Sequence, residues 1–534
     1  MGKSNSGRPA VVALACAGVF VAYLPVVTVA VSLPAIQRAL HASTAQLAWV
    51  QDAFVLPMAA LILTAGLLGD IHGRRGVYLA GLGLCAAGAV TALCAGSVQV
   101  LWIGQALAGA GAAALLPVTL GLISHAVPDH QQRGKYIGIW TTCMMGAMVV
   151  GPLVAGPVVT HLGRRWIHVL PLVCALIALA AAARLLPDSR PPHARRPDVP
   201  GQVTAAVAIT ALVYGVIEGG EAGFSHPASY LTLTLAAVAL AAFVAVERRS
   251  PSPMLDLTLF RSPGFTASAL VAAVSFLGLI GFFFVLSLYL GIVQRLGTTE
   301  AALRVILVNL VSMTLGLAAG RIMRHVRPRV LITTGLLVAA AALATMLGLE
   351  ADTSYVALAW RLALLGLGLG LVMPCITAVA VSSVPPHQAG MAGTGNNAFR
   401  QVGSALGPAL LGTLLASRAA DSLAGRMDEA GVAAPAARRA VETAREDGIG
   451  AVAGLDLGPD TGRAMDALSA AFLDGLRLCL TVSSTLLVVA ALAAAVLLRP
   501  RRVPAAGGPP AAAGAQKSPT GRGPEPVTAP TPAH

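Results

Sequence analysis

Apolar runs about 20 residues long alternate with short polar connections along this chain of 534 residues. One helix of that length crosses the hydrocarbon core of a bilayer. The runs are continuous and lack the alternation over about ten residues that marks the strands of a membrane barrel. The pattern therefore predicts an all-α polytopic membrane protein with fourteen transmembrane helices, at residues 11–33, 47–68, 77–95, 98–123, 135–159, 166–186, 201–217, 230–246, 265–290, 301–320, 330–349, 356–381, 391–417 and 476–498.

The composition also indicates a membrane protein. Hydrophobic residues make up 56% of the chain and charged residues only 11%, whereas a soluble domain carries about 25% charged residues. The first run, 11–33, is longer than the apolar core of a secretion signal and lacks a cleavage site of small residues. We therefore expect it to remain as the first span.

The positive charge lies in alternate connections between the apolar runs. The formal net charge is +13, but it is spread over short loops, which argues against nucleic acid as a partner. Loops rich in Lys and Arg face the cytoplasm. We therefore expect a multi-pass protein of the plasma membrane with both termini cytoplasmic, and the loops concerned carry Arg74, Arg75, Arg133, Lys135, Arg195, Arg196, Arg248, Arg249, Arg324, Arg327, Arg329, Arg501 and Arg502.

The chain lacks the motifs of an enzyme or of an ATP-driven pump. The lysines, Lys3, Lys135 and Lys517, do not stand in the G-x-x-x-x-G-K-[ST] pattern that cradles phosphates. No G-x-S-x-G occurs, and no His, Asp and Glu cluster has metal-ligand spacing. The seven cysteines lie in apolar runs and form no C-x-x-C. We expect no enzymatic activity, no cofactor and no metal.

The predicted spans fall into two related halves, because a basic turn with glycine follows both the second and the tenth span. Two related halves with a site at the midplane are a common transporter architecture. The expected divisions are a cytoplasmic N-terminus 1–10, a six-helix bundle 11–186, a linker with two inserted helices 187–262, a second six-helix bundle 263–498 that contains an external loop 418–470, and a disordered cytoplasmic tail 499–534. Within the loop, 433–447 is predicted to be an amphipathic helix.

A short stretch between the second and third spans combines glycines with charge. Its glycines are expected to let the chain reverse in a tight turn. Its aspartate is placed to accept hydrogen bonds from free amides at a helix end. Contacts of its charges between helix ends would hold one closed state of a rocking transporter. This gating motif consists of Gly66, Gly69, Asp70, Gly73, Arg74 and Arg75.

Polar side chains inside the spans are candidates for function, because a charge in the bilayer is costly and faces a cavity or a partner. Asp52 lies about one turn into the second span and is the leading candidate for proton binding; the alternative is a helix-end carboxylate in water. Asn396, Asn397 and Arg400 share a helix face. They would contact a substrate, or they would join helices by hydrogen bonds. Further candidates for the substrate cavity are Gln105, Arg304 and Asn309.

Several motifs occur together along residues 10–500. They include the gating motif, Trp49-Val50-Gln51-Asp52-Ala53-Phe54, Leu116-Pro117, Gly151-Pro152 and Gln388-Ala389-Gly390-Met391. As a set they resemble the fourteen-helix drug:proton antiporter family of the major facilitator superfamily, of the multidrug and antibiotic efflux type. The resemblance implies a major facilitator fold of two six-helix bundles plus two inserted helices.

The resemblance also implies a function. A protein of this kind exports an amphiphilic small molecule, such as a drug, an antibiotic or a metabolite, by proton antiport with alternating access. Gly151, Pro152 and Gly156 would then form the antiporter-type motif of the fifth span, although an ordinary kinked helix has the same composition. The expected partners are a small-molecule substrate, protons and the lipid bilayer, and the expected state is a monomer.

The chain departs from that family at positions linked to coupling. Pro25 stands where the family often has an acid in its first span, and Gln105 replaces the arginine of the fourth span. Arg324 stands in the second basic turn where the first has Asp70. A proton-independent facilitator therefore stays open as an alternative, as does a sensor that keeps the fold without transport.

Overall fold

The computed structural model describes residues 8–40, 42, 44–127, 130–187, 198–221, 223–385, 388–446, 449–452 and 454–498. No strand occurs among these residues, which confirms the all-α prediction. Twelve of their helices are long and apolar enough to cross a membrane. Two long helices, α2 and α13, fall outside that set, because the apolar stretch of α2 covers only Trp49–Ile62 and α13 is interrupted by polar side chains. Fourteen spans therefore stays a prediction.

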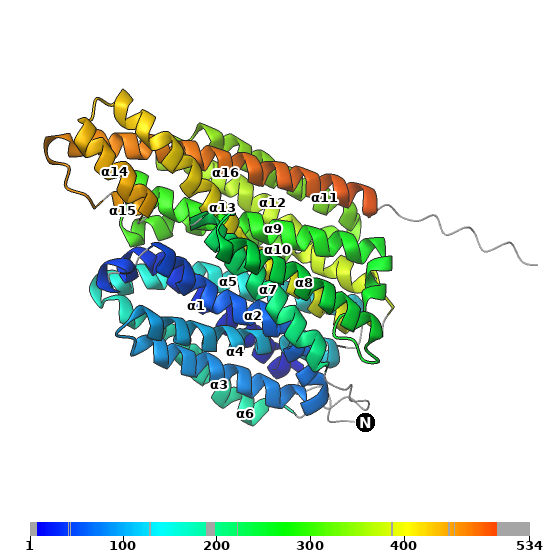
Figure 1. Ribbon diagram of the computed structural model, residues 1–534. Helices are drawn as coiled ribbons and strands as arrows, with labels where there is room; N and C mark the ends of the chain where they lie inside the picture. Colours follow the sequence, from blue (N-terminus) through cyan, green and yellow to red (C-terminus); the bar gives the residue numbers. More distant parts are fainter. Residues whose placement is uncertain are drawn as a thin grey trace, which may run out of the picture. The chain divides into compact units, whose positions relative to one another are not determined.

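The first six long helices pack together as one group (Figure 1). Most are continuous apolar helices, and Ser97 caps the start of α4 by accepting a hydrogen bond from the Val100 amide. The 3-10 turn η1 (Arg164–His168) leads into the last helix of the group. The N-terminal group consists of α1 (Arg8–Leu40), α2 (Thr44–His72), α3 (Arg74–Leu93), α4 (Val98–Ala126), α5 (His130–His161) and α6 (Val169–Leu185).

A second group of six long helices follows in the C-terminal half. Proline stands in the first turn of α9 and of α11, where its missing amide costs no hydrogen bond. A π turn, η3 (Tyr289–Val293), continues α9. The C-terminal group consists of α9 (Pro263–Leu288), α10 (Thr298–His325), α11 (Pro328–Thr345), α12 (Tyr355–Ser382), α13 (Ala389–Glu429) and α16 (Thr461–Leu497).

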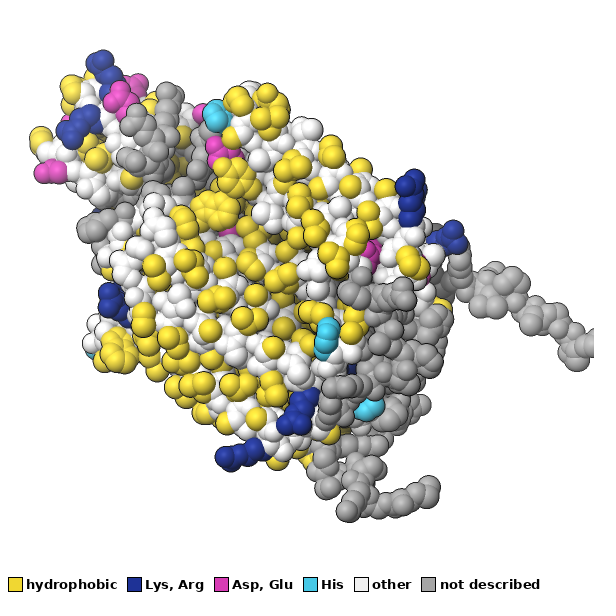
Figure 2. Space-filling view, turned by 60° about the horizontal axis from the view of Figure 1, so that its bottom comes forward, with side chains coloured by type: hydrophobic (Ala, Val, Ile, Leu, Met, Phe, Trp, Pro, Cys, Tyr) yellow, Lys and Arg dark blue, Asp and Glu magenta, His cyan; other side chains and the backbone are white. Residues whose placement is uncertain are grey.

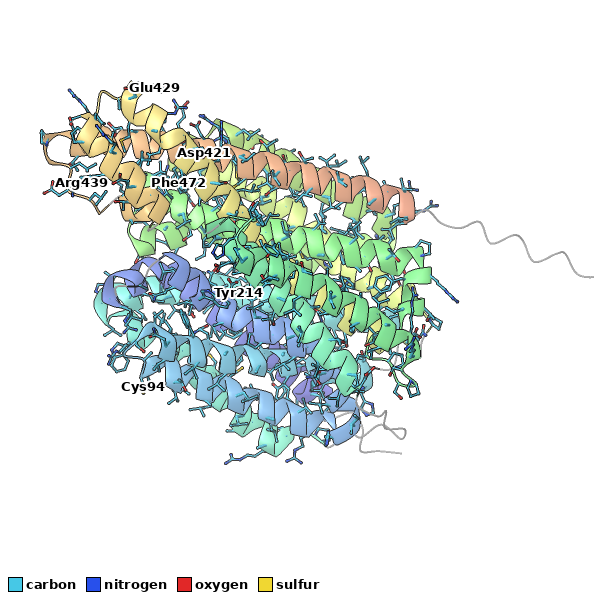
Figure 3. All side chains as sticks on the ribbon, in the orientation of Figure 1. Cys94, Tyr214, Asp421, Glu429, Arg439 and Phe472 are labelled. Carbon is cyan, nitrogen blue, oxygen red and sulfur yellow. The ribbon has the colours of Figure 1, made fainter. Side chains whose placement is uncertain are left out.

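An inserted hairpin joins the two groups. It consists of α7 (Val199–Glu221) and α8 (Pro227–Arg249), and a linker with the 3-10 turn η2 (Leu257–Arg261) leads from it to α9. Helix α7 packs against both α2 and α13, so the hairpin touches each group. Figure 3 labels Tyr214 on α7, which lies between the two groups.

The described residues between 419 and 471 form a lobe beyond one end of the bundles (Figures 1 and 3). The lobe contains the end of α13, α14 (Ala434–Glu446), α15 (Ile449–Val452), η6 (Gly458–Asp460) and the start of α16. It has an apolar core of its own, built around Leu423, Met427 and Leu468. The predicted helix at 433–447 is confirmed by α14. The gating motif lies at the opposite end of the bundles, which we call the basic end.

Glycines allow the helices to approach closely. A Cβ on Gly88 of α3 would meet the Ala108 amide nitrogen of α4 at 2.6 Å, and a Cβ on Gly403 of α13 would overlap the Ala273 carbonyl of α9. Lipid supplies no hydrophobic driving force between helices, so membrane bundles depend on this backbone-to-backbone packing. Small residues therefore hold each group together.

The outer surface is apolar across the middle of the molecule. Figure 2 shows hydrophobic side chains over the centre of one face, whereas Lys, Arg, Asp and Glu gather toward its edges. Large exposed apolar residues include Ile177 on α6, Val238 on α8 and Leu492 on α16. A water-soluble surface does not carry an apolar patch of this extent, so the molecule is a multi-pass membrane protein. The predicted tail, 499–534, and residues 1–7 lie outside the described residues.

Candidate functional site

A cavity of about 780 Å³ lies between the two groups of helices. Leu33 of α1, Leu47 of α2 and Leu290 of η3 line it, and these residues lie toward the lobe end of their helices. Its walls are mostly apolar, with Phe276 and Phe284 from α9 among them. Pockets of about 300–1,000 Å³ with apolar walls and a few polar groups accept drug-sized ligands.

The two groups of helices touch each other on the side of the cavity that lies toward the basic end. Gly66 of α2 packs against α13 there, and a Cβ on this glycine would meet Thr394 Cγ2 at 3.2 Å. Closer to the lobe end, the side-chain amide nitrogen of Gln401 on α13 donates to the Tyr23 hydroxyl on α1 at 3.4 Å. Asn309 of α10 donates to the Met148 carbonyl of α5 at 3.3 Å. These contacts join the two groups on the basic side of the cavity and along its wall.

Asp52 lines the cavity, as its place near the start of the second span predicted. Its side chain is only 2% exposed. Its carboxylate makes no hydrogen bond or ion pair to another residue that the structure describes. A buried carboxylate without a fixed partner readily exchanges a proton for a cationic or hydrogen-bonding ligand. Asp52 therefore places a buried carboxylate without a described partner on the cavity wall.

Gln105 of α4 lines the same cavity as Asp52. Helices α2 and α4 approach closely here, because a Cβ on Gly109 would overlap the Phe54 carbonyl. Gln105 is buried and its Oε1 atom has no hydrogen-bond partner. An unpaired buried acceptor costs free energy unless a ligand or water donates to it. The geometry therefore assigns Gln105 as a group that is free to accept a hydrogen bond from a ligand.

The polar stripe of α13 lies away from the cavity wall. Arg400 is buried, with its guanidinium carbon 4.3 Å from the centre of the Phe276 ring. It donates to Asn397 Oδ1 at 3.2 Å and to the Met144 sulfur of α5 at 3.4 Å. Asn396 donates to the Ser268 carbonyl of α9 at 3.2 Å. The structure thus places Asn396 and Arg400 in contacts between helices and Asn397 in a contact within α13, and none of the three lines the cavity.

Arg304 is also held away from the cavity wall. It donates to Gln294 Oε1 at 2.6 Å and lies over the Tyr355 ring. Gln294 in turn donates to the Tyr289 hydroxyl at 3.0 Å and to the Thr353 carbonyl at 2.9 Å. The predicted place of Arg304 on the cavity wall is therefore not observed. Asn309, the remaining candidate, does line the cavity.

The predicted tight turn is present but is shorter than expected, because most of the gating motif is helical. Helix α2 continues to His72 and α3 begins at Arg74, which leaves Gly73 alone between them. Gly73 has φ 91°, a value that glycine adopts without strain. Gly66 and Gly69 do not reverse the chain; they allow close packing, Gly66 on Thr394 and Gly69 on Val118.

The arginines of the gating motif bind backbone carbonyls of neighbouring helices. Arg74 donates to the Gly121 carbonyl of α4 at 2.9 Å, and Arg75 donates to the Ala183 carbonyl of α6 at 2.8 Å. Ala183 lies in the last turn of α6, where a cation is favourable, whereas Gly121 lies more than one turn before the end of α4. The side chain of Asp70 lies outside what the structure describes. The two arginines therefore join helices within the N-terminal group.

The antiporter-type motif lies where α5 crosses between the groups. A Cβ on Gly151 would overlap Val27 of α1, and a Cβ on Gly156 would meet the Thr299 Cα of α10 at 3.0 Å. Pro152 lines the cavity. The small residues of α5 therefore permit contact with α1 on one side and with α10 of the other group on the other side.

The structure adds functional candidates that the sequence did not single out. Ile449 and Met465 of the lobe line the cavity and form its roof. Arg295, at the mouth of the cavity, has a positive φ of 54°, the one non-glycine residue with positive φ among the described residues. Gln51, Tyr23 and Gln401 also line the wall. Gln51 could have been identified from the sequence, because it stands next to Asp52. The contact of Ile449 and Met465 with the cavity depends on long-range packing and could not.

The sequence model of the Major Facilitator Superfamily matches residues 15–408. The tetracenomycin C resistance and export protein of Streptomyces glaucescens is 32% identical over 484 residues, which cover 90% of each chain. The multidrug resistance protein Stp of Mycobacterium tuberculosis is 33% identical over 400 residues, or 75% of this chain and 74% of that protein. These relatives are named for resistance and export.

A solved structure has the same fold. A bacterial homologue of the human lysosomal transporter Spinster, in an inward-facing and unoccupied conformation, superposes with a TM-score of 0.61. The alignment covers 92% of this chain and 97% of that chain, at 17% sequence identity. The sequence match and the shared fold agree: the chain belongs to the Major Facilitator Superfamily and is a transporter, not an enzyme.

Proposed function

We propose that this protein exports an amphiphilic small molecule across the plasma membrane in exchange for protons, by alternating access. The observation that carries the proposal is the apolar cavity of about 780 Å³ between the two groups of helices, with the buried Asp52 on its wall. The names of the relatives, resistance and export proteins, support a drug or an antibiotic as the substrate.

Substrate recognition follows from the mixed character of the cavity wall. Phenylalanines and methionines of the wall bury the apolar part of a ligand. This burial favours binding by roughly 25 cal/mol for each Å² of apolar surface removed from water. Gln105 and Asn309 offer hydrogen bonds that orient it. A wall of this kind tolerates many amphiphilic shapes, because few directional contacts have to be satisfied.

Exchange with protons follows from competition for one carboxylate. When the cavity faces the outside, a proton neutralises Asp52 and the substrate leaves. When the cavity faces the cytoplasm, Asp52 loses the proton and the substrate binds in its place. Protonation and substrate binding then exclude each other, which couples their movement in opposite directions.

Alternating access requires that contacts at the two ends break in turn. At the basic end, the packing of Gly66 on Thr394 holds the groups together in this conformation. The small residues of α5 let it slide against α1 and α10 with little steric cost. The basic end faces the cytoplasm in this proposal, and so do both termini, in keeping with the positive-inside rule. One chain contains the whole cavity, so a monomer suffices.

The proposal is tested in inside-out vesicles that acidify their lumen and carry a pH-sensitive dye. Ethidium and tetracenomycin C are the first probes. Antiport predicts that a transported probe dissipates the gradient with wild-type protein and leaves it unchanged with Asp52→Asn. Asp421→Asn, an exposed acid on the lobe, is the matched control and should behave like wild type.

A proton-independent facilitator is the second candidate function, favoured by Pro25 and Gln105 at the positions where the resemblance implies an acid and an arginine. Its signature is counterflow of labelled probe without any change in the gradient. That result would replace antiport by facilitated diffusion and leave the cavity assignment intact. No movement of either probe, by exchange or by counterflow, would contradict transport and favour a sensor.

A further inference from the structure

Two carboxylates meet at the basic end of the inserted hairpin, far from the residues that line the transport cavity. Asp198 precedes α7, and Glu247 lies in the last turn of α8. Both are buried, with 7% and 4% of their surface exposed. Each uses one oxygen to bind backbone: Asp198 Oδ1 accepts from the Gly201 amide at 2.9 Å, and Glu247 Oε2 accepts from the Leu255 amide at 3.3 Å.

The other two oxygens have no hydrogen-bond partner and lie beside the same glycine, Gly201. Asp198 Oδ2 and Glu247 Oε1 are both buried and make no hydrogen bond. Each lies within 3.0 Å of the point that a Cβ on Gly201 would occupy, so the two atoms are within about 6 Å of each other. Gly201 leaves the space that lets them approach.

No positive charge compensates this pair in the part of the chain that the structure describes. Arg248 and Arg249 on α8 and Arg261 on η2 form no ion pair with either carboxylate. Asp256 of the linker adds a further negative charge and is itself bound by Gln388. The first turns of α9 and α13, which pack here, carry no charged residue. Two ionised carboxylates this close and this buried repel strongly.

We propose that Asp198 and Glu247 form a proton-binding site, in which one proton is shared between Asp198 Oδ2 and Glu247 Oε1. The proton comes from the aqueous phase at the basic end, and the pair then carries one negative charge instead of two. This site is separate from Asp52 and does not depend on what the cavity transports.

The linker connects this site to the C-terminal group. Glu247 holds the Leu255 amide, and the Leu255 side chain lies in an apolar cluster with Phe265 of α9 and Ala392 of α13. The next residue, Asp256, accepts from Gln388 at 3.1 Å. Loss of the shared proton would force the carboxylates apart and release Leu255. The proton site therefore makes the attachment of the hairpin sensitive to pH at the basic end.

Infrared spectroscopy tests the shared proton directly. The protein is reconstituted in the Asp52→Asn background, so that the cavity carboxylate contributes no signal. We expect a carbonyl stretch of a protonated carboxylic acid at neutral pH that disappears at high pH. Asp198→Asn and Glu247→Gln, which keep the backbone hydrogen bonds, should each abolish it. A spectrum without that band in the parent protein would overturn the proposal.

Hydrogen exchange of residues 254–256 gives a second readout. As long as the closed site holds the proton, exchange in wild type should rise about tenfold more per pH unit than in Glu247→Gln, because opening then requires loss of that proton. The control Asp421→Asn should match wild type. Equal slopes in wild type and Glu247→Gln would contradict a proton at this site, and so would protection of wild type by added Na⁺, K⁺ or Ca²⁺, which would assign a metal cation instead.

Discussion

The rings of Trp49 on α2 and Tyr214 on α7 pack with their centres 5.8 Å apart and their planes at 46°. Trp49 also meets Trp102 on α4, at 6.4 Å between ring centres. This aromatic cluster lies one helical turn before Asp52. It fixes the start of α2 against the inserted hairpin. The hairpin therefore supports the part of the cavity wall that carries Asp52.

Replacing Tyr214 by Leu should loosen this support. The aromatic contact contributes about 1 kcal/mol to the free energy of unfolding beyond area burial. We expect a lower melting temperature in detergent and slower transport for Tyr214→Leu. Tyr214→Phe keeps the ring and is the matched control. Equal melting temperatures for the two variants would show that the ring contact is not what stabilises the hairpin.

Replacing Gly109 by Ala should separate α2 from α4 next to Asp52. The added Cβ overlaps the Phe54 carbonyl, which belongs to the backbone and cannot rotate away. Overpacking of this kind costs about 1–3 kcal/mol. Gly146→Ala, on α5, adds a methyl group with nothing within 4 Å and should be neutral. A Gly109→Ala protein with wild-type stability and transport would contradict the close contact.

The lobe should influence which substrates are accepted, because Ile449 forms part of the cavity roof. Ile449→Ala removes apolar contact with a bound ligand. We expect the KM of a transported probe to rise roughly fivefold, or about 1 kcal/mol, with kcat little changed. Val441→Ala lies in the lobe but not on the cavity and is the control. Equal KM values for both variants would show that the lobe does not contribute to substrate recognition.

The lobe is held by an ion pair between α13 and α16. Arg426 donates from Nε and Nη2 to Asp474, with Nη2 to Oδ2 at 2.9 Å. The Arg426 side chain is about one-third exposed, so water and salt weaken the ion pair. Arg426→Met should therefore lower the free energy of unfolding by only about 1 kcal/mol, and by less at high salt. Arg463→Met, whose ion pair with Asp460 is longer, at 3.8 Å, is the control.

The effect of Arg426→Met should not depend on pH in the range where transport is measured. Hydrogen bonding to Asp474 raises the pKa of Arg426 above its usual range. A raised pKa means that the stabilisation is present below the ordinary pKa and is lost only as the pH rises past the higher value. Melting curves of wild type and Arg426→Met should therefore differ by a constant amount between about pH 6 and pH 8.

The apolar runs predicted the helices well because a membrane span is defined by local composition. Boundaries were less predictable. Helix α2 continues through Asp70 to His72 because one glycine, Gly73, suffices to turn the chain, and the sequence offered three glycines for that role. The helix at 433–447 was predicted because its amphipathic pattern is local too.

The site was predictable only in part, because a sequence shows that a residue is polar but not which neighbour it faces. Asp52, Gln105 and Asn309 line the cavity. Arg400 does not, since Phe276 and Met144 from distant helices enclose it. The meeting of Asp198 with Glu247 depends on how the hairpin folds back, which no local pattern records.

In the proposed exchange, substrate and proton compete for Asp52. The most direct measurement is proton release from purified protein in weak buffer when a probe that the vesicle assay has identified is added. We expect release of up to about one proton per chain from wild type and none from Asp52→Asn. Equal release from both proteins, or binding of the probe to wild type with no release, would contradict it.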